Sequence, residues 1–181
     1  MNLFTDRFKA SLATSLYVIG LYITTGVVGT LQLWLRQHGL QRTVSATLLC
    51  VFVVLVVYLV VVRLNRRSVG DIAALVAAGL VYAYLIKTYA KAPSDWIHLI
   101  EYPPLAVIAY YTLKLSVSGS MAFVYAMALT TAVGAGDEFL QSYVPARTAD
   151  LHDFIVNVIS SAVSLAVVWI VIERKEKVVE S

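Results

Sequence analysis

Acidic, amide and imidazole side chains gather in two short parts of this sequence. In the first part, His98 and Glu101 are three residues apart and share one face of a helical turn, so the carboxylate can orient the imidazole or share a ligand with it. The second part, residues 136–157, lies between two long apolar runs. Its charged, amide and imidazole members are Asp137, Glu138, Gln141, Arg147, Asp150, His152, Asp153 and Asn157. Ionisable groups so close to apolar runs are costly, and function usually explains them.

Helical spacing predicts how the second part is arranged. Asp137 and Gln141 are separated by four residues and share a face at the end of one helix. Asp150, Asp153 and Asn157 follow i, i+3, i+7, which predicts a polar stripe pointing into the protein from the start of the next helix. We therefore expect two antiparallel helices to face each other with acidic groups.

Residue chemistry suggests a role for each candidate. Carboxylates and an imidazole can transfer protons, whereas amides and a guanidinium can hold a polar or anionic substrate. The catalytic candidates are His98, Glu101, Asp137, Glu138 and Asp153, and the substrate-binding candidates are Gln141, Arg147 and Asn157. If the two parts form one site, His98 or Glu101 should lie within about 10 Å of Glu138, Arg147 or Asp153.

Each group also has a purely structural interpretation. His98 and Glu101 could be a hydrogen-bonded pair that fixes a kinked helix, and Arg147 could be a clasp that neutralises carboxylates. One guanidinium cannot balance so many acids, so a clasp would also need protonated carboxyls, a second cation or water. Asp150 and His152 are expected to face water near a helix start. The aromatic belt at the membrane interface is expected to include Trp96, Tyr102 and Tyr143.

Composition predicts an integral membrane protein. Of the 181 residues, 60% are hydrophobic and 14% are charged, and the mean hydropathy is +0.79, well above the level of a soluble domain. Because a spanning helix needs about 20 apolar residues, we predict an all-α bundle of six transmembrane helices in one domain, residues 1–181. The predicted spans are Ala10–Leu35, Thr43–Val62, Ile72–Ala90, Trp96–Lys114, Leu115–Gly136 and Phe154–Ile172.

The fourth predicted span contains adjacent prolines. Pro103 and Pro104 remove backbone donors and press against the carbonyls of the preceding turn. Either the helix begins near Pro103, or it is kinked and frees the carbonyls of Leu99 and Ile100. Such backbone is tolerated at membrane depth only inside protein or beside a wet cavity, so a site is expected there.

The distribution of basic residues predicts the orientation. Six spans place nine Lys and Arg residues on the side of the termini and five on the other side. The protein is expected in the inner membrane of the cell. Because the side richer in Lys and Arg is usually cytoplasmic, both termini are expected to face the cytoplasm. The polar motifs, with six of the eleven acidic residues, are then extracytoplasmic.

The motifs resemble those of the VanZ-like membrane proteins, a family named after a teicoplanin-resistance protein. The resemblance covers residues 95–164 and is carried by two patterns. These are Asp95-x-x-His98-x-x-Glu101-Tyr102 and the ordered series Asp137, Glu138, Gln141, Pro145, Arg147, Asp153 and Asn157. The resemblance implies a small multi-pass envelope protein, linked in some members to glycopeptide resistance.

Three classes of function are compatible with these residues. The first is an enzyme acting on a lipid-linked or cell-wall phosphate or glycosyl substrate, with His98 or Glu138 as acid and base and Arg147 as an anion clamp. The second is a divalent-cation site formed by Asp137, Glu138, Asp153 and His98, for which oxygen ligands favour Mg, Ca or Mn. The third is non-enzymatic, a binder of lipid or amphiphilic antibiotic or a subunit of a membrane complex. Membrane lipids are the expected partners, and no nucleic-acid site is expected.

Overall fold

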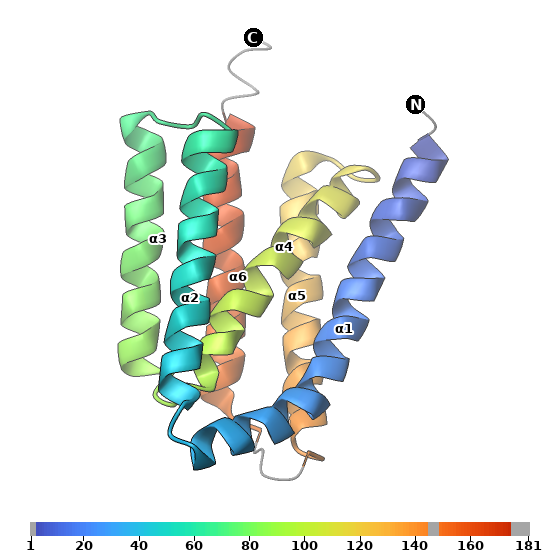
Figure 1. Ribbon diagram of the computed structural model, residues 1–181. Coiled ribbons are helices and arrows are strands. Elements are labelled where there is room, and N and C mark those ends of the chain that lie inside the picture. Colours follow the sequence, from blue (N-terminus) through green and yellow to red (C-terminus); the bar gives the residue numbers. More distant parts are fainter. Residues whose placement is uncertain (1–2, 145–148, 175–181) are drawn as a thin grey trace.

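The computed structural model describes residues 3–144 and 149–174, in which helices are joined by short turns and loops and no β-strand occurs (Figure 1). The α-helices are α1 (Leu3–Gln37), α2 (Gln41–Tyr58), α3 (Val69–Thr88), α4 (His98–Lys114), α5 (Gly119–Gln141) and α6 (Leu151–Val168). Short π-helical segments, η1 (Leu59–Arg63) and η3 (Trp169–Glu173), continue α2 and α6, and a 3-10 turn, η2 (Asp95–Ile97), precedes α4. Each predicted span corresponds to one α-helix, which confirms the all-α bundle.

Several helices have the length and composition of membrane spans. Four uninterrupted helical segments of the described residues are long and apolar enough to cross a membrane, namely Gln41–Arg63, Val69–Thr88, Gly119–Gln141 and Leu151–Glu173. Large apolar side chains such as Val54, Val76 and Leu80 are exposed on α2 and α3. Such exposure suits contact with lipid, because the tails are as apolar as the side chains they meet.

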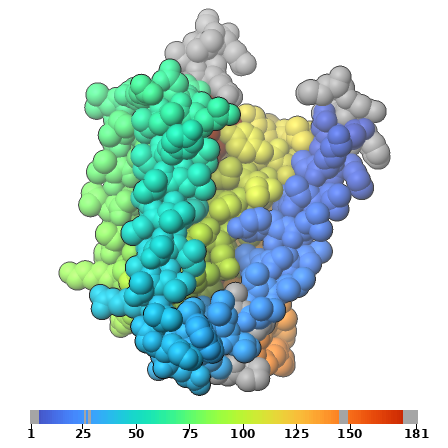
Figure 2. All heavy atoms as spheres, viewed as in Figure 1, coloured from blue at the N-terminus to red at the C-terminus, as the bar shows by residue number. Residues whose placement is uncertain are grey.

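Helix α1 changes direction along its length. Its segments Thr5–Thr25 and Gly29–Gln37 are inclined by 43° to each other. The first segment runs beside α4 and α5, and the second lies across one end of the bundle (Figure 1). The space-filling view shows this second segment covering that end below α4 (Figure 2). At the same end α4 and α6 begin and α5 ends, so α1 closes over the ends that carry the polar motifs.

Helix α4 forms the centre of the bundle, in contact with α1, α5 and α6. Its 17 residues make it shorter than the qualifying spans, and it includes fully buried Leu105, Ala109 and Tyr110. Pro103 and Pro104 lie inside this helix, so the alternative in which the helix begins at Pro103 is wrong. The helix begins at His98, five residues before the proline pair, and neighbouring helices enclose it, which is where proline is tolerated in a spanning helix.

Local contacts fix the ends of other helices. Ser68 and Asp71 form a reciprocal capping box at the start of α3. At the end of the bundle that carries the termini, Lys114 Nζ lies 2.6 Å from Glu173 Oε2. Because Glu173 is only 5% exposed, this ammonium ties the end of α4 to the last turn that follows α6.

Candidate functional site

His98, the first residue of α4, lies between two carboxylates from other helices. Its Nδ1 is 3.9 Å from Oδ2 of Asp137 on α5, and its Nε2 is 3.7 Å from Oδ2 of Asp153 on α6. All three residues are buried, with exposed fractions of 3%, 1% and 8% respectively. The expected proximity of His98 to Asp153 is therefore confirmed, and both sequence motifs meet at one place.

Asp137 is held by hydrogen bonds from three different directions. Thr25 Oγ1 of α1 donates to Oδ1 at 2.6 Å. Tyr102 Oη of α4 and Gln141 Nε2 of α5 donate to Oδ2 at 3.3 and 3.1 Å. The predicted pairing of Asp137 with Gln141 is confirmed, and this network fixes the carboxylate that faces His98.

Glu138 connects the end of α5 to the start of α6. Its Oε2 accepts a hydrogen bond of 3.0 Å from the backbone N–H of Asp150. Asp150 in turn is the N-cap of α6, and its carboxylate accepts from the backbone N–H of His152 at 2.9 Å. These contacts bring the end of α5 and the start of α6 together. The two antiparallel helices therefore face each other with acidic groups, as expected.

The cap sets both the position and the acidity of Asp150. The hydrogen bond from the backbone N–H of His152 is the main cause that holds the pKa of Asp150 below its ordinary value; partial burial opposes it, and the His152 ring adds a smaller lowering effect. The side chains of Asp150 and His152 are exposed, as expected. The predicted inward stripe is therefore correct for Asp153 and Asn157 but wrong for Asp150, whose carboxylate turns back to cap the helix.

Close helix packing surrounds Asn157. A Cβ atom at Gly134 would lie 3.4 Å from Cβ of Asn157 and 3.5 Å from the Tyr102 ring, which is ordinary van der Waals distance, so α4, α5 and α6 lie close together there. Asn157 is 1% exposed, and neither its Oδ1 nor its Nδ2 has a hydrogen-bond partner among the described residues. Buried amides are nearly always satisfied, so this side chain is suited to binding a water or a polar ligand group.

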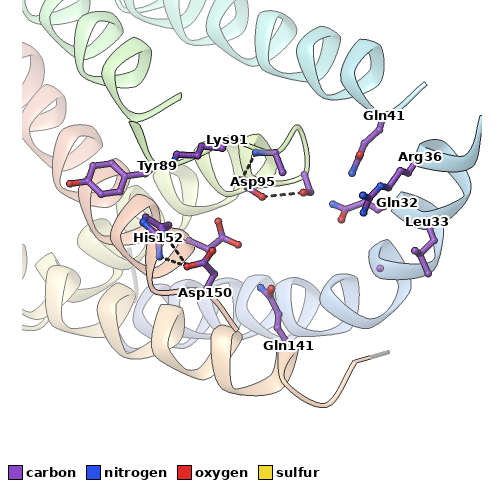
Figure 3. Close-up of a pocket in the computed structure, with 14 residues that line it drawn as sticks. Gln32, Leu33, Arg36, Gln41, Tyr89, Lys91, Asp95, Gln141, Asp150 and His152 are labelled. Carbon is purple, nitrogen blue, oxygen red and sulfur yellow. Dashed lines mark hydrogen bonds and ion pairs between the residues drawn. The ribbon is translucent and has the colours of Figure 1, made fainter. Parts of the chain in front are cut away.

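An open cavity of about 410 Å³ lies beside the buried residues. Figure 3 shows Gln32, Arg36 and Gln41 on one side of it and Asp150 and His152 on the other. The second segment of α1, the loop between α3 and α4 and the start of α6 all contribute to its wall. The wall carries both signs of charge, from Arg36, Lys91, Asp95, Asp150 and Asp153.

Asp153 and Gln141 join the buried residues to this cavity. Both side chains line the cavity, while Asp153 also faces His98 and Gln141 also bonds to Asp137. A separate crevice of about 10 Å³ is lined by Glu101, His98 and Asp137. Glu101, which is partly buried, therefore lies on the side of His98 that faces α1, where Tyr17 Oη donates to its backbone carbonyl at 2.8 Å.

The donor set that could hold a metal ion differs from the predicted one. Ligand atoms of His98, Glu138 and Asp153 all lie within 4.8 Å of one another. Asp137 is not a member of this group and instead faces the other ring nitrogen of His98. Of the remaining candidates, Pro145 and Arg147 lie outside the described residues, and the expected role of Arg147 stays a prediction.

Several polar residues of this region, among them Tyr102, Thr25, Arg36 and Lys91, were not singled out as site residues from the sequence. Tyr102 was expected in the aromatic belt, which is wrong, because it is fully buried and bonded to Asp137. Its spacing of four residues from His98 was the available signal. Thr25 and Arg36 belong to α1 and reach this region through the packing of α1 across the bundle, whereas Lys91 reaches it from the loop between α3 and η2.

The helices and the buried polar residues together define a multi-pass α-helical membrane protein. The sequence model of the VanZ/LLP1 family matches residues 14–172. The chain therefore belongs to the VanZ/LLP1 family, as its motifs indicated. Comparison with curated proteins gives no match, and comparison with solved structures gives none either.

Proposed function

We propose that this VanZ-type protein binds an anionic lipid-linked or cell-wall substrate in the open cavity and carries out acid–base chemistry on it at the extracytoplasmic face. The observation that supports this most directly is the position of Asp153. Its carboxylate lines the cavity and lies 3.7 Å from Nε2 of buried His98. A substrate in the cavity would thus meet a carboxylate backed by an imidazole.

Two cations of the cavity wall could hold an anionic headgroup, in a wall that also carries the carboxylates of Asp95, Asp150 and Asp153. Arg36 and Lys91 approach from different elements, the second segment of α1 and the loop after α3. A phosphate placed between them would accept charge-assisted hydrogen bonds from both. Because the cavity lies at the ends of membrane-spanning helices, such a substrate can keep its apolar chain in the bilayer while its headgroup enters the cavity.

The buried residues divide into groups with different roles. His98 is the proposed acid and base, assisted by Asp153, with Asp137, Glu138 and Glu101 as positioning carboxylates. Gln141 and Asn157 are the proposed polar contacts of the substrate, and Arg147 is a further proposed anion ligand. The extracytoplasmic orientation is supported by the excess of Lys and Arg at the opposite end of the bundle, where both termini lie (Figure 1).

Binding of a lipid-linked phosphate tests the proposal. The protein in nanodiscs is titrated with a polyprenyl phosphate, and bound lipid is measured by native mass spectrometry. Replacing both cations, Arg36→Gln with Lys91→Gln, should weaken binding by about 100-fold or more, since each hydrogen bond to a charged group contributes about 1.5–3 kcal/mol. Arg63→Gln with Arg66→Gln, which removes the same charge at the other end, should leave affinity unchanged.

Two results would count against the proposed function. One is equal affinity of the Arg36/Lys91 variant and the unchanged protein. The other is equal affinity for the uncharged polyprenol, which would show that the cavity does not recognise the anion. The acid–base part is tested separately by following release of phosphate or sugar from the lipid, which His98→Gln should abolish while lipid binding persists.

A further inference from the structure

We propose that His98, Glu138 and Asp153 bind one divalent transition-metal ion such as Zn²⁺ or Mn²⁺. These residues begin α4, end α5 and begin α6, so three helices each contribute one ligand. One ligand atom from each lies within 4.8 Å of the other two. All three residues are buried, as donors of a defined metal site usually are.

Small side-chain movements would bring the donors to bonding geometry. Zn²⁺ binds imidazole nitrogen and carboxylate oxygen at about 2.0–2.2 Å, so its ligand atoms are about 3.4 Å apart in a tetrahedral site. The imidazole Nε2 of His98 and Oδ2 of Asp153 are already 3.7 Å apart. Rotation of the Glu138 carboxylate about its side-chain bonds supplies the remaining adjustment without movement of a helix.

Asp137 occupies the position of an outer carboxylate behind the histidine ligand. Its Oδ2 is 3.9 Å from Nδ1 of His98, the ring nitrogen that faces away from Asp153. Metal-bound histidines commonly direct their second nitrogen to a carboxylate, which fixes the ring and increases its basicity. The hydrogen bonds from Thr25, Tyr102 and Gln141 hold this carboxylate in place.

Asn157 provides an independent observation that points to a bound group. It lies four residues after Asp153, on the same face of α6, and its Nδ2 would be 3.6 Å from a Cβ at Gly134, which is four residues before Glu138 on α5. Both amide atoms are buried without a hydrogen-bond partner among the described residues. A metal-bound water beside Asp153 could satisfy this amide, as buried waters satisfy otherwise unpaired polar groups.

The donor atoms identify the class of ion. The ligand set expected from the sequence contained three carboxylates, which favoured Mg, Ca or Mn. The structure instead groups one imidazole nitrogen with two carboxylates, a set that suits Mn²⁺ or Zn²⁺ better than Ca²⁺ or Mg²⁺. Two positive charges would also offset the cost of burying several carboxylates together.

The site is built to keep one position open. Three protein ligands and a fourth position for water or substrate are typical of catalytic zinc sites, whereas structural sites are closed by four protein ligands. Asp153 lines the open cavity, so this fourth position can be reached from it. The inference goes beyond the proposed lipid function and does not depend on it, because the ion should bind in the absence of any lipid-linked substrate. In the metal-bound protein a ligated His98 would not act as acid and base, and a water in the open position would take that role.

Metal titration of the full-length protein tests this site. Purified protein is stripped with a chelator, and Zn²⁺ or Mn²⁺ alone is added and measured by elemental mass spectrometry and calorimetry. About one ion per chain is expected. His98→Gln, Glu138→Gln and Asp153→Asn should abolish stoichiometric binding, and Asp137→Asn should weaken it by about 10- to 100-fold. His38→Gln removes an exposed histidine and should bind as the unchanged protein does.

A spectroscopic measurement on the unchanged protein keeps the proposal testable if the ligand variants fail to fold. Electron paramagnetic resonance of bound Mn²⁺, with ¹⁵N-labelled histidine, should show one coordinated imidazole nitrogen. Failure of the stripped protein to take up either ion would overturn the proposal. So would uptake that persists in folded His98→Gln and Asp153→Asn, or bound Mn²⁺ without nitrogen coupling. The lipid assay contains no added metal, so the failure of one proposal is distinguishable from the failure of the other.

Discussion

The imidazole of His98 and the carboxylate of Asp153 lie 3.7 Å apart although they begin different helices, α4 and α6. This contact joins the two sequence motifs and lies where the buried residues reach the open cavity. Because both residues are buried, solvent screens their interaction only weakly.

The first prediction is energetic coupling across this contact. In a double-mutant cycle with His98→Gln and Asp153→Asn, the single changes should be non-additive by about 0.5–3 kcal/mol, as is usual for buried groups in contact. The free energy of unfolding is measured in detergent by chemical denaturation without added metal. His98→Gln combined with Glu173→Gln, which lies at the opposite end of the bundle, should be additive. Additivity of the His98 and Asp153 changes would show that the contact carries no energy.

The second prediction concerns the contact between α1 and α5. A Cβ atom at Gly136 would lie 2.5 Å from Oη of Tyr22, which donates to the carbonyl of Val133 at 3.1 Å. Gly136→Ala should therefore destabilise the protein by about 1–3 kcal/mol through overpacking.

Removing the Tyr22 hydroxyl should relieve this clash. In a Tyr22→Phe background the nearest remaining atom is the ring carbon at 3.3 Å, so the added cost of Gly136→Ala should fall. Gly79→Ala, with no atom within 4 Å of the new Cβ, is the matched control and should cost nothing. Thermal unfolding in detergent gives all four values. An equal cost in both Tyr22 backgrounds would contradict the assigned packing.

The third prediction is a pH-dependent cap at the start of α6. The backbone N–H of His152 lowers the pKa of Asp150 from its ordinary value of 3.8. A lowered pKa in the folded state means that the cap contributes stability above the ordinary pKa and loses it as the pH falls through the folded value. Asp150→Ala should cost about 1 kcal/mol near neutral pH.

Asparagine at the same position separates the cap from its charge. Asp150→Asn retains a capping oxygen, so its stability near neutral pH should be close to that of the unchanged protein. Acid should therefore reduce the free energy of unfolding less in this variant, because residue 150 no longer titrates. Unfolding measured across the acidic range tests the difference, and identical acid profiles for the two proteins would refute the titrating cap.

The fourth prediction is the orientation in the membrane. In a Cys50→Ala background, a cysteine at Ala149 should react with an impermeant thiol reagent added to intact cells, because the loop between α5 and α6 is expected outside. A cysteine at Ser116, an exposed residue of the loop between α4 and α5, should react only after permeabilisation. The reverse pattern would invert the orientation and place the cavity in the cytoplasm.

The fifth prediction distinguishes the two interpretations of Arg147, which lies outside the described residues. As an anion clamp, Arg147→Ala should leave the melting temperature nearly unchanged and abolish binding of a polyprenyl phosphate, since no other group replaces the guanidinium fork. As a clasp, the same change should cost about 3–5 kcal/mol, because buried carboxylates would lose their cation. We expect the clamp, and a large fall in melting temperature with unchanged lipid binding would argue for the clasp.

The sequence by itself determined the helices and the inward position of most motif residues. Apolar runs of membrane length predict spans because the backbone must satisfy its own hydrogen bonds in lipid. Helical periodicity then places Asp137 with Gln141 and Asp153 with Asn157, since residues four apart share a face. Those local rules depend only on neighbours in the chain, and the structure confirms both pairs.

Only the tertiary structure decided what these faces meet. Periodicity cannot show that Tyr102 donates to Asp137 rather than lying in the aromatic belt, or that the metal-compatible group takes Glu138 and leaves out Asp137. Those outcomes depend on the central position of α4 and on the 43° bend that carries α1 across the bundle. Helix packing is a long-range result of shape and volume, and no local pattern encodes which side chains it brings together.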